Sequence, residues 1–165
     1  MMGIPRRILW LLVAAAALQI AWFYPQLPAK VASHFDGQGR PNGWMSKDGF
    51  FLLYGAMLAL QLAVFGAGAR LIRRLPDRWF NLPHRDYWLA PERRDQTLDY
   101  LEGWGLWFGC AVMAFLLGIF QLAIEANLKQ SPLALGPTWA LLGGFFAITA
   151  IAVARLLLHF ARRPR

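Results

Sequence analysis

Four uninterrupted apolar runs constrain this chain more than any other feature of its sequence. They cover approximately residues 8–24, 50–69, 104–124 and 138–160. Each is close to the roughly 20 residues that a helix needs to cross the hydrocarbon core of a bilayer. Lipid offers no partners to backbone N–H and C=O groups, so such runs must be helical. The sequence therefore predicts an all-α, polytopic membrane protein with four transmembrane helices in one domain, residues 1–165.

The basic residues predict how the helices are oriented. The formal net charge is +8, but the cations flank the apolar runs and form no stripe with interleaved aromatic residues, so we expect no nucleic-acid partner. By the positive-inside rule both termini and the loop at 70–103 are cytoplasmic, and the loop at 25–49 faces outward. The residues placed inside are Arg6, Arg7, Arg70, Arg73, Arg74, Arg78, Arg85, Arg93, Arg94, Arg155, Arg162, Arg163 and Arg165.

The first apolar run has features of both a signal peptide and a transmembrane helix. Its apolar core is longer than a usual signal h-region, and Trp22, Phe23 and Tyr24 stand where a cleavage site would need small residues. Those three rings also suit the aromatic belt at a membrane surface. We therefore expect an uncleaved helix.

The outer loop at 25–49 is the one long polar, turn-rich segment between two apolar runs. Its prolines forbid a continuous helix, while Asp-Gly and Asn-Gly pairs suit a tight hairpin. Aromatic and charged side chains stand among these turns, so we predict an ordered surface that binds a ligand or partner. The candidate binding residues are His34, Phe35, Asp36, Arg40, Trp44 and Lys47.

A metal site at the outer loop is an alternative that we weighed. His34, Asp36 and Asp48 offer one imidazole and two carboxylates, whereas zinc sites usually present three or more closely spaced protein ligands. We favour a structural role: His34 and Asp36 bond the loop backbone, Phe35 and Trp44 pack the loop onto the bundle, and Lys47 meets the headgroups. No metal and no cofactor is predicted.

The cytoplasmic loop at 70–103 is the second informative segment. Its first part mixes prolines with aromatic residues, a composition that suits the headgroup region. From Pro91 onward, Glu92 and Asp95 in an opening turn and Leu98 with Leu101 on one face predict a short amphipathic helix before the third span. The motif residues are Asn81, Pro83, Tyr87, Trp88, Pro91 and Arg93.

The spans contain small-residue ridges and few polar groups. The ridges predict close helix packing within one chain or between copies, so a homo-oligomer is open. Interhelical hydrogen bonds are expected for Gln19, Gln61, Gln121 and Thr149. No ionisable residue lies near a predicted midplane, which argues against pumps and proton-coupled transporters. The ridges are Gly55, Ala59, Ala63 and Ala67; Gly105 and Gly109; and Gly136, Ala140 and Gly144.

Two stretches carry a resemblance to a known family. The outer-loop sequence HFDGQGRPNGW, and NLPHRDYWLAPERRDQTLDYL in the cytoplasmic loop, resemble short stand-alone members of the membrane family labelled domain of unknown function 1648. That domain also forms the N-terminal part of the SdpI-like immunity protein of the sporulation-delaying-protein toxin system. Two positions depart from the usual motif, with Ala32 in place of proline and Asn42 in place of aspartate. The resemblance implies a multi-pass protein of the bacterial plasma (inner) membrane.

These features favour a binding protein over an enzyme. The sequence lacks GxSxG, HExxH, CxxC and a phosphate-binding glycine loop, so we expect no catalytic activity. The first hypothesis is that the outer loop recognises a peptide toxin, an envelope component or a partner protein, for immunity or sensing. The alternative is a non-catalytic subunit or assembly factor of a membrane complex. A solute channel or carrier is the least favoured class.

Overall fold

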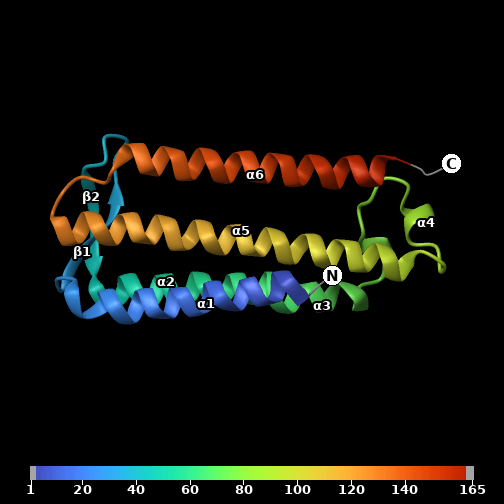
Figure 1. Ribbon diagram of the computed structural model, residues 1–165, viewed down its shortest axis with the longest axis horizontal. Coiled ribbons are helices and arrows are strands. Elements are labelled where there is room, and N and C mark those ends of the chain that lie inside the picture. Colours follow the sequence, from blue (N-terminus) through green and yellow to red (C-terminus); the bar gives the residue numbers. More distant parts are fainter. Residues whose placement is uncertain (1–2, 163–165) are drawn as a thin grey trace.

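A computed structural model describes residues 3–162, without the side chains of Ala69 and Arg70. Two residues used to predict the orientation, Arg163 and Arg165, lie outside the described residues. The chain is mostly helical, and its long helices lie nearly parallel, with a small hairpin at one end of the bundle and a looped segment at the other (Figure 1).

Four helical segments are long and apolar enough to cross a membrane, which confirms the four predicted spans by length and composition. The first is α1 (Gly3–Phe23), extended by the short helix η1 (Tyr24–Gln26). The second is α2 (Lys47–Gln61), which continues into the π-helix η2 (Leu62–Ala67). The third and fourth are α5 (Arg94–Lys129) and α6 (Leu135–Ala161).

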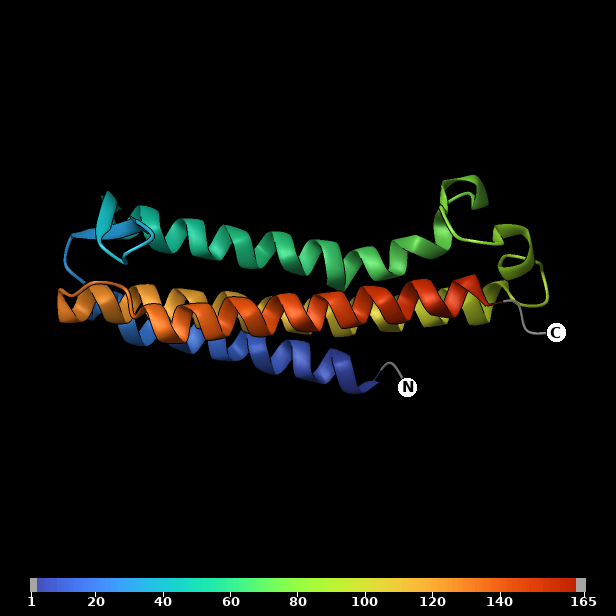
Figure 2. The same ribbon diagram turned by 90° about the horizontal axis from the view of Figure 1, so that it is seen from above.

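Helix α5 is the central element of the bundle. The helices α1, α2 and α6 all pack on it. In Figure 1 it lies between α6 and the α1–α2 pair, and in Figure 2, seen from above, α6 covers most of it. One core cluster lies near the hairpin, where Tyr54 of α2 stacks on Phe120 of α5 with ring centroids 3.9 Å apart. A second cluster joins Leu9 of α1 to Leu106 and Met113 of α5.

The predicted glycine ridges are mostly open within the chain. Only Gly109 makes a close helix contact, since a Cβ at this position would lie 2.6 Å from the Cβ of Phe65. A Cβ at Gly55, Gly105 or Gly144 would meet nothing within 4 Å. The packing contact at Gly118, where a Cβ would approach the Leu141 side chain of α6 at 2.9 Å, was not predicted.

The polar residues of the spans are largely paired across helices. The Tyr54 hydroxyl donates to Gln19 Oε1 over 2.6 Å, and Gln19 Nε2 donates to Gln121 Oε1 over 2.8 Å. Gln61 Nε2 donates to the carbonyl of Gly109 over 2.6 Å. The expected interhelical bonds are therefore confirmed for the three glutamines. The Thr149 hydroxyl has no partner among the described residues, which contradicts the prediction there.

The connection from the second span to the third is folded around a small core of its own. It contains α3 (Gly68–Leu71), η3 (Ile72–Arg74), η4 (Asp77–Trp79) and α4 (Arg85–Trp88). Phe80, Leu89 and Leu98 form this core. The helix predicted from Pro91 into the third span begins three residues later, at Arg94, and continues without interruption to Lys129, so it is the first part of α5.

The predicted all-α fold class needs one correction, because a β-hairpin accompanies the helices. Two strands, β1 (Lys30–Phe35) and β2 (Pro41–Ser46), form an antiparallel two-stranded sheet between the first two spans. A two-stranded sheet is marginally stable alone in water, so its supports on the helix bundle determine what this end of the molecule can do.

Candidate functional site

The hairpin is built around a turn that Asp36 closes. Its backbone N–H donates to the carbonyl of Arg40 over 2.9 Å, and its Oδ1 accepts from the backbone N–H groups of Gln38 at 2.9 Å and Arg40 at 2.8 Å. Gly39 takes the left-handed conformation, with φ of 78°, that favours glycine. The predicted role of Asp36 in bonding loop backbone is thus confirmed.

His34 lies beside two irregularities in the strand register. It pairs with Gly43, where a Cβ would come within 3.0 Å of the imidazole. Its Nδ1 lies 3.0 Å from the hydroxyl of Ser33, so the polar partner is a side chain and not the loop backbone that we predicted. The residue is exposed.

Asn127 of α5 fastens the hairpin to the bundle. Its Oδ1 accepts from the backbone N–H of Ala32 over 2.6 Å, and its Nδ2 donates to the Ala32 carbonyl over 2.9 Å. Ala32 lies opposite Trp44 in the sheet, and its polar groups point away from β2. One side-chain amide therefore acts as a neighbouring strand would, and it satisfies both free groups of a residue that is 2% exposed.

Two further contacts hold the hairpin in place. The backbone N–H of Leu133, in the loop between α5 and α6, donates to the Gly39 carbonyl over 2.8 Å. Val31 is fully buried in the core cluster, with Met45 packed against it. The sheet is thus attached at its base, at its middle and at its turn.

The outward surface of the hairpin is aromatic and basic. We predicted that Trp44 packs the loop onto the bundle, but its side chain is 54% exposed. Val31 and Met45 pack the hairpin onto the bundle, because they occupy the inward positions of the two strands. The ammonium of Lys30 lies 6.0 Å from the centroid of the Trp44 ring. Arg40 is exposed, and Phe35 is half-buried.

Lys47 belongs to a separate contact at the start of α2. Its ammonium lies 4.6 Å from the centre of the Tyr24 ring, whose hydroxyl donates to Asp48 over 2.7 Å. The Asp48 carboxylate therefore accepts a hydrogen bond from Tyr24. Within residues 3–162, no three His, Cys, Asp or Glu side chains are grouped so that they could hold a metal ion.

The motif residues of the 70–103 loop lie at the opposite end of the bundle (Figure 1). Trp88 donates its indole N–H to the Phe160 carbonyl of α6 over 3.0 Å. The Arg93 guanidinium stacks on Tyr87, 4.2 Å from the ring centre. The other three are exposed, namely Asn81, Pro83 and Pro91. Because α5 separates them, the two motifs cannot form one site.

A buried carboxylate at this second end was not predicted. Glu102 is 3% exposed and pairs with Arg6 of α1 through one oxygen and with Arg73 Nε, at 3.4 Å, through the other. Arg73 also bonds Asp99, which raises the pKa of the guanidinium above its already high value. The only sequence signal was an acidic residue two positions before the third apolar run, and this does not indicate which arginines reach it.

The comparison with protein families gave one match. Residues 11–58 match the family described as Domain of unknown function (DUF1648), which confirms the resemblance over that part of the chain. The match covers most of α1, the whole hairpin and the first part of α2. It leaves out Asn127 and Leu133, the residues that fasten the hairpin from α5 and its following loop. No curated protein and no solved structure matches the chain.

Proposed function

We propose that this multi-pass membrane protein, of SdpI-like type, recognises a peptide toxin, an envelope component or a partner protein at the external face, for immunity or sensing. The observation that carries the proposal is the exposed Trp44 on a hairpin that Asn127 holds in place. The contact surface consists of Lys30, His34, Arg40 and Trp44, which we call the hairpin surface. A surface ordered before binding loses little conformational entropy when its partner arrives, which favours affinity.

The chemistry of the hairpin surface suits an anionic partner with an apolar part. Lys30 and Arg40 supply positive charge, and the indole of Trp44 supplies a large rigid contact. Exposed tryptophan and arginine are the residue types that most often dominate binding energy at interfaces. A peptide with acidic residues beside an apolar side chain fits these features.

The orientation in this proposal rests on the positive-inside rule. The arginine-rich end of the bundle is cytoplasmic and the hairpin end is external, in the inner membrane of a bacterium. The proposed activity is binding, since the hairpin surface offers an exposed indole and two cations, which are groups that suit contact with a partner.

Photocrosslinking in native membranes tests the proposal. A photoreactive side chain replaces Trp44, and a matched variant carries it at Trp139, which is 64% exposed on α6 at the same end of the bundle. We expect capture of a peptide, protein or envelope molecule from position 44 only. Capture of the same lipids from both positions, with both variants expressed, would contradict the proposal.

The alternative, a non-catalytic subunit or assembly factor, is favoured by one observation. The α6 span is the most exposed of the four, and its Gly136 and Gly144 face open space. Gly144→Leu should then abolish co-purification of a partner without disturbing the fold. Gly109→Leu is unsuitable for this test, because Gly109 packs against Phe65 within the chain. Normal co-purification with Gly144→Leu would argue against this function.

A further inference from the structure

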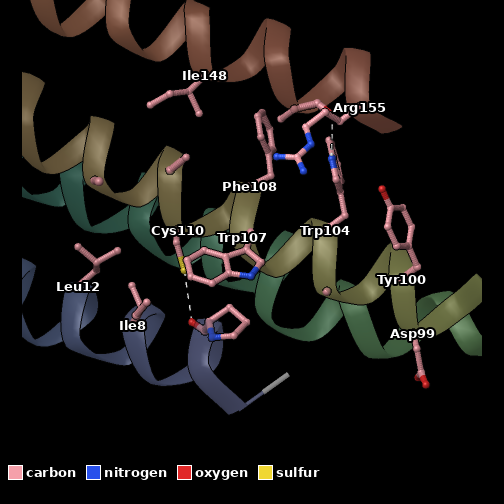
Figure 3. A pocket seen from close by; sticks show the side chains of 15 residues that line it. Ile8, Leu12, Asp99, Tyr100, Trp104, Trp107, Phe108, Cys110, Ile148 and Arg155 are labelled. Carbon is pink, nitrogen blue, oxygen red and sulfur yellow. Dashed lines mark hydrogen bonds between the residues drawn. The ribbon is translucent and has the colours of Figure 1, made fainter. Parts of the chain in front are cut away.

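An open groove of about 1000 Å³ lies along the bundle at the end away from the hairpin. The helices α1 and α6 form its walls and α5 forms its floor (Figure 3). Its surface is mainly apolar, with Ile8 and Leu12 on one wall, Ile148 and Ala152 on the other, and Trp107 and Phe108 on the floor. The volume is at the upper end of the roughly 300–1,000 Å³ typical of small-molecule pockets.

The length of the groove matches one leaflet of a bilayer. Its floor extends along α5 from Asp99 to Ala114, with Tyr100 next to the first of these. At 1.5 Å per residue this is roughly 22 Å, close to half of the approximately 40–45 Å thickness of a bilayer with its headgroups. The groove begins where α5 meets the arginine-rich loop and ends near the middle of the helix.

The rim of the groove is cationic. Arg155 lines it, and a second, smaller hollow next to it shares Arg155 and Tyr100 and adds Arg162 and His159. Figure 3 shows the Arg155 side chain directed from α6 toward α5. Neither Arg155 nor Arg162 has a carboxylate within ion-pair distance in the described part of the chain.

The other polar groups at the rim are accounted for. Asp99, the one carboxylate lining the groove, is bonded to Arg73. The Tyr100 ring stacks on His159 with centroids 4.0 Å apart, and Figure 3 shows its hydroxyl directed toward α6. The Trp104 indole N–H is occupied by the Ala152 carbonyl, at 3.1 Å. The rim therefore presents unpaired positive charge with a hydroxyl beside it, directly above an apolar channel.

We propose that the groove holds one acyl chain of an anionic phospholipid, with the phosphate bound by Arg155 and Arg162. The apolar channel matches the chain in length and chemistry, and the two guanidinium groups match the phosphate, for which arginine is a preferred partner. The lipid comes from the leaflet at the arginine-rich end. Its role is to join α1 to α6, both of which pack on α5.

Lipid retention by the purified full-length protein tests this proposal. The protein is incubated with detergent-dissolved phosphatidylglycerol and phosphatidylcholine of equal chain length, and bound lipid is measured by native mass spectrometry. We expect the wild type to retain phosphatidylglycerol in preference. Arg155→Gln should lower that retention about tenfold, the effect of roughly 1.4 kcal/mol, and Ala152→Phe, which narrows the channel, should lower retention of both lipids.

Arg78→Gln is the matched control. Arg78 is an exposed arginine at the same end of the molecule and does not line the groove, so the loss of its charge should leave retention unchanged. Equal retention of the two lipids by the wild type would overturn the proposal, as would an equal loss in Arg78→Gln and Arg155→Gln. If Ala152→Phe fails to fold, a photoreactive side chain at Ile148 replaces it: crosslinking to phosphatidylglycerol supports the proposal, and crosslinking to a second copy of the chain overturns it.

Discussion

The two ends of the bundle are held together by different kinds of interaction. At the hairpin end, an uncharged amide, Asn127, satisfies two backbone groups of Ala32. At the arginine-rich end, the carboxylate of Glu102 joins Arg6 and Arg73. Both residues are on α5 and both are nearly buried, roughly 37 Å apart along the helix axis at 1.5 Å per residue. One rigid element therefore organises both ends.

The difference indicates how each end should respond to its surroundings. Neutral hydrogen bonds in a buried setting are screened little by salt, and they position the hairpin in one geometry. Ion pairs whose arginines are 36–40% exposed are open to screening and to rearrangement. We therefore expect a rigid hairpin end, suited to recognition, and an arginine-rich end that adapts to salt and to headgroups.

Asn127→Ala should have the largest effect. It removes both partners of Ala32 and leaves a buried N–H and C=O unpaired, which should destabilise the hairpin end by roughly 2–4 kcal/mol. Hydrogen exchange measured by mass spectrometry should show faster exchange for residues 30–46, with the arginine-rich end unchanged. Lys129→Ala is the control on the same helix, since it removes only an exposed ion pair with Glu125. Equal protection of the hairpin in both variants would show that Asn127 does not support it.

Glu102→Gln should have the next largest effect, at the other end. The two arginines lose their buried partner, but each is partly exposed and can reach water, so we expect a loss of about 1–3 kcal/mol. The measurement is hydrogen exchange of residues 97–102 and of the first turns of α1. Glu92→Gln, at an exposed position of the same loop, is the control. If Glu102→Gln speeds hydrogen exchange at the hairpin as much as it does near residue 102, the two ends are not independent.

Salt should change hydrogen exchange at the arginine-rich end more than at the hairpin end, by a smaller amount than the two substitutions. Raising the ionic strength from about 0.01 M to about 1 M shortens the Debye length from about 30 Å to about 3 Å. We expect exchange near Glu102 to become faster by the equivalent of at most about 1 kcal/mol. Exchange of residues 30–35 should not change, and an equal salt response at both ends would contradict the comparison.

Trp44→Ala should have the smallest effect on stability. The side chain is 54% exposed and lies on the outward face of β2, so its removal should change the free energy of unfolding by no more than about 0.5 kcal/mol. Thermal unfolding in detergent measures this. Val31→Ala is the contrasting variant. Because Val31 is fully buried, this substitution should lower the free energy of unfolding. A large loss of stability with Trp44→Ala would mean that the indole supports the fold and is not a free binding group.

Much of the architecture was predictable, but the candidate site was predictable only in part. The turn residues around Gly37 and Gly39 indicated a hairpin, and Asp36 was expected to bond the loop backbone. Trp44 was given an inward packing role, although the strand alternation places it outward opposite Ala32. The role of Asn127 was not predicted, since its partner lies 95 residues away in sequence.

The sequence by itself determined the four spans and the position of the hairpin between the first two. Hydropathy and turn propensity are local properties, and each can be evaluated along the chain without knowledge of distant residues. Only the tertiary structure decided that α5 is the central helix and that α1 and α6 leave a groove between them. It also decided that Asn127 faces the hairpin and that Glu102 faces Arg6 and Arg73. Those contacts depend on how each helix is rotated and which helices are neighbours, and the four spans are too uniformly apolar to specify either.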